Sequence, residues 1–381
     1  MELVWATNDF RIAGRPYPGF PILLLDTMES FVPGNIFLRY YLLRGSIGSR
    51  KSWPSTARAL YDYFSFLAAN SLNWQNISSP NTKDMVAAYR DYCLIDCKLS
   101  RSTVRQRLIY VCKFYEYSRQ QDWISDLPFQ YEERSTNPGN GFFAHLSTGR
   151  IKISSYDVLP RTHKPTLKFL NIGDIKLLIK AAQNPHHRMI IRFALQTGLR
   201  REEIATFPLS YIINRPESPT SERNIRIHLD PNDGQGMQTK GGKPRHIYIS
   251  KRFMIDLHRY AVQVRGERSA LSGPIHKSLF LNKFGAPYSN GGKGIERLVR
   301  NLGKKIGIVA HPHMLRHSYA THTLIGLRKT DSRIDPLVFI QNQLGHSSIQ
   351  TTLVYLHLVN ELADDAVLAY DDELNRDLGE S

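Results

Sequence analysis

The most informative part of this chain is the pair of stretches HPHMLRHSYATHTL (residues 311–324) and QNQLGHSSIQTTLVY (residues 341–355). In the first, His313 and Arg316 stand three residues apart in a segment whose apolar residues recur with helical spacing. A helix would therefore present both polar side chains on one face. Because a guanidinium and an imidazole both bind oxyanions well, this stretch predicts a helix that holds an anionic group.

The second stretch adds another imidazole and a phenol. His346 follows a Leu-Gly break, and Tyr355 comes nine residues later in a segment whose paired serines suit the start of a helix. A guanidinium binds phosphate through two hydrogen bonds, an imidazole exchanges protons near neutral pH, and a phenol can act as a nucleophile. Together the two stretches predict transfer of a phosphoryl group to a tyrosine.

Two upstream stretches extend this pattern. TGLRREEI (residues 197–204) supplies Arg200 with Glu203 one helical turn later. TKGGKPRHIYI (residues 239–249) supplies Lys240 in a glycine-rich turn before an alternating strand. The chain thus presents, in order, an arginine, a lysine, a His-x-x-Arg motif, a histidine and a tyrosine.

This ordered set resembles the tyrosine recombinase (phage integrase) family. The resemblance covers about residues 166–360 by motif and residues 31–125 by helical pattern alone. Carried over by position, it implies that Glu203 supports the first arginine. It also implies a catalytic set made of Arg200, Lys240, His313, Arg316, His346 and Tyr355.

The chemistry of these side chains predicts how charge on the phosphate is neutralised. Arg200 and Arg316 would hold the two non-bridging oxygens, and Lys240, with Lys243 as its rival, would protonate the departing 5′ oxygen. Apart from two adjacent glutamates after the first arginine, no carboxylates stand with the motif residues. The sequence therefore predicts a reaction that uses neither a metal ion nor a cofactor, because side chains supply the positive charge.

The histidines and the tyrosine would divide the remaining work. His313 would take the tyrosine proton or steady the phosphate, and His346 would donate to a non-bridging oxygen; His311 and His317 lie near enough to compete for these roles. Tyr355 would attack the phosphate. A phenol, with an unperturbed pKa of about 10, leaves far more easily than an alcohol, so a phosphotyrosyl bond can be reversed by a DNA hydroxyl without ATP.

Composition points to a polyanionic partner. The 381 residues carry 50 Lys and Arg against 34 Asp and Glu, a net charge of +16, and 41% are hydrophobic, as expected of a folded protein that attracts nucleic acid. No apolar run could span a membrane, and the N-terminus lacks a signal-peptide layout, so we expect a cytoplasmic, nucleoid-associated protein. In that compartment Cys93, Cys97 and Cys112 are expected to be reduced core thiols.

The spacing of apolar residues predicts a mainly α-helical fold with a small antiparallel sheet. Four short helices would form an N-terminal core-binding domain that clamps DNA, and strands near 224–228 and 246–250 would form the sheet of an α/β catalytic domain. The expected divisions are an N-terminal extension (1–30), the helical domain (31–125), a linker with a possible packed insertion (126–165), the catalytic domain (166–359) and an amphipathic tail helix (360–381).

Basic residues of the helical domain are candidates for DNA contact. A solvated charged face is the ordinary interpretation of such residues, and both interpretations stand at this point. The candidates, two before the second helix and three along one face of the fourth, are Arg50, Lys51, Arg101, Arg105 and Lys113.

The predicted function is site-specific DNA recombination through a 3′-phosphotyrosyl intermediate, as in integration, transposition or resolution. The family resemblance implies double-stranded DNA sites as partners and a tetramer on paired sites, with accessory DNA-bending or directionality proteins as further candidates. The tail would dock into a neighbouring protomer or onto its own domain. Two alternatives remain, namely DNA relaxation of the type IB topoisomerase kind and a catalytically inactive site-specific DNA-binding protein.

Overall fold

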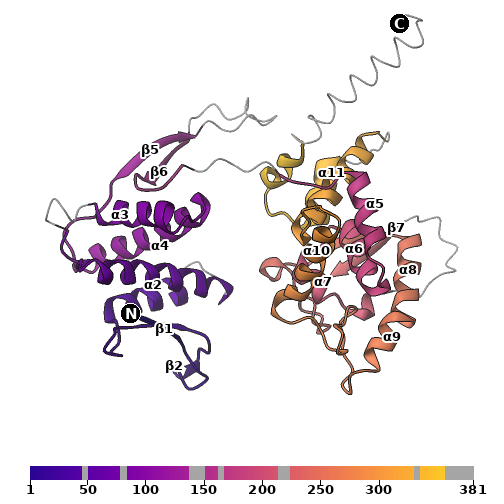
Figure 1. The fold of residues 1–381 in the computed structure, drawn as a ribbon, viewed down its shortest axis with the longest axis horizontal. Coiled ribbons are helices and arrows are strands. Elements are labelled where there is room, and N and C mark those ends of the chain that lie inside the picture. The colour runs from indigo at the N-terminus through magenta and orange to yellow at the C-terminus, as the bar shows by residue number, and fades with distance from the viewer. Residues whose placement is uncertain are drawn as a thin grey trace, which may run out of the picture. The chain divides into compact units, whose positions relative to one another are not determined.

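The protein divides into two compact units, Met1–Lys164 and Pro165–Ser381 (Figure 1). Its structure is a computed structural model that describes residues 1–44, 50–77, 84–136, 151–161, 167–212, 224–329 and 335–356. The predicted tail helix at 360–381 lies outside the described residues. Helices predominate in the described ranges, and each sheet there is an antiparallel pair of strands, which confirms the predicted fold class. No helix in those ranges is both long and apolar enough to cross a bilayer.

Four helical segments build the first unit, as predicted. A proline in its first turn opens the second segment, and the Ser100 side chain caps the fourth by accepting a 3.2 Å hydrogen bond from the Thr103 backbone N–H. The segments are α1 (Val32–Arg39, continued by a π-helical turn at Tyr40–Arg44), α2 (Trp53–Ala69), α3 (Met85–Asp91, continued by a π-helical turn at Tyr92–Asp96) and α4 (Arg101–Gln120).

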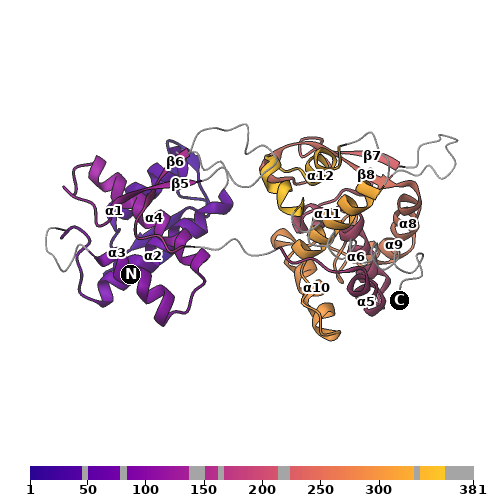
Figure 2. The same ribbon diagram turned by 90° about the horizontal axis from the view of Figure 1, so that it is seen from above.

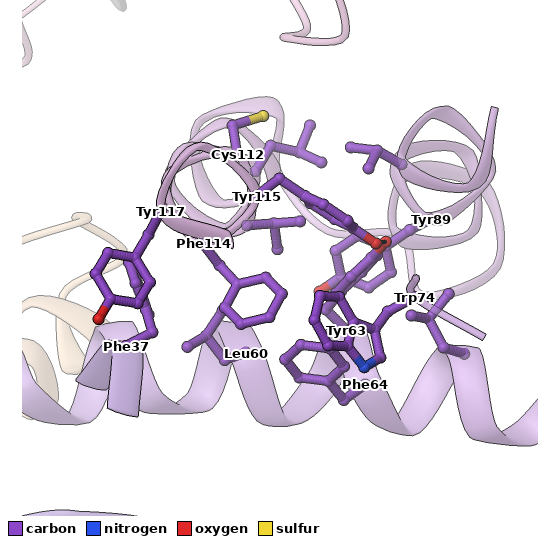
Figure 3. Close-up of a cluster of buried hydrophobic side chains, with 14 of the residues drawn as sticks. Phe37, Leu60, Tyr63, Phe64, Trp74, Tyr89, Cys112, Phe114, Tyr115 and Tyr117 are labelled. Carbon is purple, nitrogen blue, oxygen red and sulfur yellow. Dashed lines mark hydrogen bonds between the residues drawn. The ribbon is translucent and has the colours of Figure 1, made fainter. Parts of the chain in front are cut away.

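The core of the first unit is rich in aromatic side chains (Figure 3). Val104, Leu108, Val111 and Phe114 of α4 are fully buried, as their spacing of three and four residues predicts. Aromatic side chains from α1 and α2 pack edge to face against Phe114 of α4, and Tyr89 of α3 packs edge to face against Tyr63 of α2. The first unit therefore has a hydrophobic core of its own.

The cysteines only partly follow the prediction. All three are free thiols, and Cys93 and Cys112 are buried in the core. Cys97 is exposed, so its prediction as a core thiol was wrong. The reason is its position directly after the π-helical turn that ends α3, where the chain leaves the core.

The N-terminal segment packs onto the same helices. Strand β1 (Glu2–Trp5) pairs with β4 (Pro21–Leu24). The short strands β2 (Arg11–Ile12) and β3 (Arg15–Pro16), which lie between those two in the sequence, pair with each other. Phe20 and Leu23 are buried in the aromatic core. The first thirty residues thus contribute directly to the core of the first unit.

The segment expected to be a linker contains a β-hairpin. Strands β5 (Tyr131–Thr136) and β6 (Ile151–Tyr156) are antiparallel, and the flanking Phe129, Val158 and Leu159 are buried in the first core. Of the apolar residues expected in an insertion, Phe142 and Phe143 lie outside the described residues. The hairpin belongs to the first unit, and the division between the units falls after Lys164.

Helices α6 and α11 pack against each other at the centre of the second unit, with a strand hairpin beside α12 (Figure 2). Ile190, Ile191 and Phe193 of α6 are buried, and Gly198, in the left-handed region at φ 64°, ends that helix as predicted. The elements are α5 (Ile172–Ala181), α6 (Pro185–Thr197), α7 (Arg201–Ala205), β7 (Asn224–Leu229), β8 (Arg245–Ser250), α8 (Lys251–Val262), α9 (Val264–Ser269), α10 (Lys293–Lys305), α11 (Pro312–Lys329), α12 (Pro336–Leu344) and a last helical segment at 349–356.

The hairpin β7–β8 confirms the predicted antiparallel pair and positions the end of α12. Ile247 and Ile249 face the core, and the neighbouring residues of β8 face outward. On the outer edge of β8, the buried Gln343 side chain accepts a hydrogen bond from the Tyr248 N–H at 2.9 Å and donates to the Tyr248 carbonyl at 3.2 Å. This amide holds the last turn of α12, and hence His346 just beyond it, against the sheet.

Candidate active site

The helical segment 349–356 brings Tyr355 against α11. The tyrosine is only 1% exposed and packs with Leu324 and Leu344, and its hydroxyl lies 2.8 Å from His317 Nδ1. Burial raises the pKa of Tyr355, and the opposing effect of the Arg316 charge does not cancel this. At neutral pH the phenol is therefore protonated, and it needs a proton acceptor before it can attack.

Arg316 of α11 is also buried, at 1% exposure. Its Nη1 donates to the Gly198 carbonyl at 2.6 Å, and its Nη2 donates to the Leu344 carbonyl at 2.7 Å and to His346 Nε2 at 3.1 Å. The two carbonyls lie at the C-terminal ends of α6 and α12, where helix dipoles favour a cation. Arg316 thus connects α11 with the ends of α6 and α12. Burial and the charge of Arg200 lower the pKa of Arg316.

His346 uses both ring nitrogens. Because arginine has no acceptor, Nε2 must accept the Arg316 bond, and Nδ1 carries the proton that it donates to Thr352 Oγ1 at 3.0 Å. Burial and the neighbouring guanidinium charges lower the pKa of His346 to about 3, so the ring is neutral at pH 7. Its ring plane lies within 3° of that of Tyr355, with centroids 6.3 Å apart. In this arrangement His346 orients Arg316.

A buried carboxylate positions Arg200 at the start of α7. The Arg200 backbone N–H donates to Glu203 Oε2 at 2.8 Å, and its Nη1 donates to Oε1 at 3.2 Å. Glu203 is 1% exposed, and Arg245 at the start of β8 donates to both of its oxygens at 2.8 Å. Burial alone would raise the pKa of Glu203, but the bonds from Arg245 and Arg200 outweigh it and lower that pKa. The Arg200 side chain remains 24% exposed.

Lys240 and His313 are both exposed. Lys240 sits in the turn between β7 and β8, where the two following glycines adopt positive φ. His313 is exposed on the first turn of α11, with its ring centroid 4.3 Å from that of His317. Desolvation lowers the pKa of His313, and neighbouring charges that include Lys240 lower it further. The role of Lys240 in this site stays a prediction.

The predicted residues other than Lys240 therefore lie in one region, and two further residues join them. His317, considered at first only as a competitor, contacts the tyrosine hydroxyl, and Arg245 was missed altogether. A signal for Arg245 exists in the sequence, because strand alternation puts it on the same face as Ile247 and Ile249, and an inward-facing arginine needs a buried acid. His311, the other competitor, caps α11 by accepting the Met314 N–H at 3.2 Å through Nδ1.

The basic DNA-contact candidates of the first unit differ in their surroundings. Three are exposed and two are half-buried along α4, and these are respectively Arg50, Lys51 and Arg101, then Arg105 and Lys113. The Arg50 guanidinium lies 5.4 Å from the Trp53 ring centre, and Lys113 Nζ lies 5.3 Å from that of Tyr41. The aromatic rings orient these two cations without neutralising them.

Comparisons with known proteins agree with this chemistry. A model described as the phage integrase family matches residues 168–361, half of the chain. The chain is 28% identical over 209 residues to tyrosine recombinase XerA of Saccharolobus solfataricus, a match that covers 55% of this chain and 58% of that protein. It is 24% identical over 368 residues to transposase A from transposon Tn554 of Staphylococcus aureus, which covers 92% of this chain and 93% of that protein.

A solved structure shares the fold. The XerH site-specific recombinase bound to a palindromic difH substrate, in a post-cleavage complex, has a TM-score of 0.56 to this chain at 16% sequence identity. The match covers 84% of this chain and 80% of XerH. At such low identity this likeness concerns the fold, and the side-chain contacts above carry the chemistry.

Proposed function

Because this chain belongs to the phage integrase family, we propose that it cleaves and rejoins double-stranded DNA at specific sites with Tyr355 as its nucleophile. The chain is a site-specific DNA recombinase, an enzyme that transfers DNA strands, like its relatives named tyrosine recombinases and a transposase. The observation that supports the residue assignment is a buried tyrosine whose hydroxyl lies 2.8 Å from a neutral imidazole, that of the residue directly after Arg316.

In the proposed cleavage step the Tyr355 oxygen attacks the scissile phosphorus and the 5′ oxygen departs, leaving a 3′-phosphotyrosyl bond. Arg200 and Arg316 stabilise the charge that develops on the non-bridging oxygens; removal of one such donor typically costs about 10²- to 10³-fold in rate. Lys240 protonates the 5′ oxygen. Rejoining reverses these events, and a hydroxyl from a second strand completes recombination.

His346 and Glu203 support the two arginines in this proposal. His346 accepts from Arg316, and Glu203 binds Arg200 through both its backbone and its guanidinium. A direct bond from His346 to a non-bridging oxygen stays a prediction. Its Nε2 now accepts a hydrogen bond from Arg316 and would have to carry a proton of its own to donate to the phosphate. His313, whose exposed ring lies beside His317, would contact the phosphate in this proposal.

The function is tested by covalent trapping on a nicked suicide duplex, in which the short cleaved fragment diffuses away. The chain is expected to form a protease-sensitive protein–DNA adduct linked through Tyr355. The adduct should form equally in EDTA, since arginines and a lysine supply the positive charge. A catalytically inactive DNA-binding protein would retard the duplex in a gel without forming an adduct. A strict need for a divalent ion would overturn the proposal that Arg200 and Arg316 neutralise the phosphate.

We extend the proposal to assembly as a tetramer on two DNA sites of a mobile element, in which residues 360–381 of each protomer dock onto a neighbour. This tail places apolar residues among many acids, so it is unsuited to lie on DNA. Closed rings are built by such head-to-tail contacts. The first unit would hold DNA phosphates through the five basic candidates named above, as the net charge of +16 favours.

Gel-shift titrations separate DNA binding from assembly. Binding to a single site should weaken steeply between low and moderate salt, because phosphate contacts release counterions. Deletion of residues 360–381 should leave this binding within about twofold and abolish the slower-moving complex of paired sites. Normal paired complexes from the truncated chain would exclude docking of the tail between protomers, and salt-independent binding would exclude the phosphate contacts.

A further inference from the structure

The hydroxyl of the proposed nucleophile contacts a histidine outside the His-x-x-Arg pair. Tyr355 Oη lies 2.8 Å from His317 Nδ1, within ordinary hydrogen-bond distance. His313, four residues earlier on α11, has its ring centroid 4.3 Å from that of His317 and is exposed, whereas Tyr355 is buried. Of the two histidines, His317 is therefore the one that contacts the phenol, and His313 is the more exposed.

We propose that His317 is a catalytic residue that accepts the Tyr355 proton through Nδ1, a role that rests on the proposed function. In cleavage the Oη–H bond breaks and its proton moves to Nδ1 while Oη bonds to phosphorus. The bond from phosphorus to the 5′ oxygen breaks, and that oxygen takes a proton from the Lys240 ammonium. In rejoining, the attacking hydroxyl gives its proton to the Lys240 amine, and His317 returns its proton to the departing phenolate.

The surroundings of His317 keep its ring neutral before DNA binds. Burial lowers the pKa of His317 to about 3, and nearby positive charge contributes, so the ring has a free lone pair at neutral pH. A scissile phosphate bound to the arginines would add negative charge next to the ring and make it more basic. The titratable and charged groups that face His317 are His311, His313, Arg316, His346 and Tyr355.

The test uses His317→Asn, because the asparagine amide can occupy the place of Nδ1 and accept a hydrogen bond but cannot take a proton. Cleavage of the suicide duplex is measured in single turnover with saturating protein between pH 6 and 9. We expect a loss of about 10²-fold or more at pH 7 with unchanged DNA binding, as for loss of a general base. The variant depends on phenolate formed beforehand, so its rate should rise about tenfold per pH unit, more steeply than that of the native chain.

Two comparisons and one replacement variant sharpen this test. A fluorinated tyrosine with a more acidic phenol, inserted at position 355, should speed His317→Asn far more than it speeds the native chain. His322→Gln is the matched control, since His322 also lies on α11 but bonds to the Leu170 carbonyl at 2.8 Å, away from the site. It should cleave at the native rate. If His317→Asn does not fold, His317→Gln, judged first by circular dichroism, takes its place.

The outcomes distinguish two kinds of failure. If the native chain forms adducts and His317→Asn cleaves at the native rate with the native pH profile, the histidine only positions the phenol and the inference is wrong. The same holds if His313→Asn shows the steep pH dependence and His317→Asn does not. If the native chain forms no adduct at any pH, the proposed function itself fails.

Discussion

Replacing Tyr355 with phenylalanine should abolish covalent attachment to the suicide duplex completely, because the change removes only the oxygen that would bond to phosphorus. The ring would still fill its buried site beside Leu324 and Leu344. Loss of the hydrogen bond to His317 should cost roughly 1 kcal/mol of unfolding free energy, so the variant stays folded and keeps its affinity for DNA. Denaturing gels of labelled duplex measure the adduct, and gel shifts measure binding.

Tyr319→Phe is the control for this substitution. Tyr319 lies one turn along α11 from Arg316, yet its ring packs against Gly198, and the hydroxyl that contacts His317 is that of Tyr355. This variant should form the adduct at close to the native rate. An adduct from Tyr355→Phe after exclusion of contaminating native protein, or its loss in Tyr319→Phe, would mean that another oxygen is the nucleophile.

Most helices could be predicted because their signals are local. The buried face of α4 repeats every three or four residues, and the left-handed glycine at 198 ends α6. The hairpin β7–β8 was predictable for the same reason, since Ile247 and Ile249 alternate with polar residues. In each case the residues that decide the element lie within the element or directly beside it.

The packing of residues 1–30 and 126–161 could not be predicted in this way. Their strands are short, and what fixes them is burial of Phe20, Leu23 and Phe129 in a core made by helices elsewhere in the chain. The contacts within the candidate active site were equally hard to predict from the sequence. Motif order pointed to the arginines, the lysine and the tyrosine, but the Tyr355–His317 and Glu203–Arg245 contacts join residues 38 and 42 positions apart. Such contacts depend on how helices and strands pack.

Breaking the ion pair between Glu203 and Arg245 should destabilise the fold strongly. Arg245→Met should lower the unfolding free energy by roughly 3–5 kcal/mol, the usual cost of leaving a buried charge without its partner. Two 2.8 Å bonds to a carboxylate that is 1% exposed would be lost. Arg245 also packs closely against Gly345, since a Cβ added at Gly345 would lie 2.7 Å from the Arg245 Cδ. The substitution therefore loosens both the support of Arg200 and the segment that leads to His346.

Cleavage should suffer separately from stability. A displacement of about 1 Å in a phosphate-binding group costs on the order of 10²-fold in rate, and Arg200 depends on the same carboxylate. Single-turnover cleavage at a temperature where Arg245→Met is fully folded should fall by about this factor while binding to a single DNA site persists. That separation identifies Arg245 as a positioning residue, whereas a purely structural role would leave the rate of the folded fraction unchanged.

The pH dependence has a defined sign. In the native chain the pKa of Glu203 is lowered, so its ion pairs contribute stability above the ordinary carboxyl pKa, and this contribution is lost as the pH falls through the lowered value. Without Arg245, burial becomes the dominant influence and raises that pKa, so the folded variant gains by binding a proton. The difference in unfolding free energy between native and variant should be largest near pH 7 to 8 and shrink toward pH 5.

Two further variants decide whether the unpaired Glu203 carboxylate causes the effects of Arg245→Met. Arg192→Met removes another arginine of the same unit, whose Nη2 donates to Asp256 at 2.6 Å in a pair about 30% exposed. It should cost about 1 kcal/mol or less and leave cleavage unchanged. Adding Glu203→Gln to Arg245→Met should recover part of the lost stability, because no unpaired buried charge remains, but not the cleavage rate, because Arg200 then lacks its carboxylate. If the double variant is less stable than Arg245→Met by the full effect of Glu203→Gln alone, the two residues do not act as a pair.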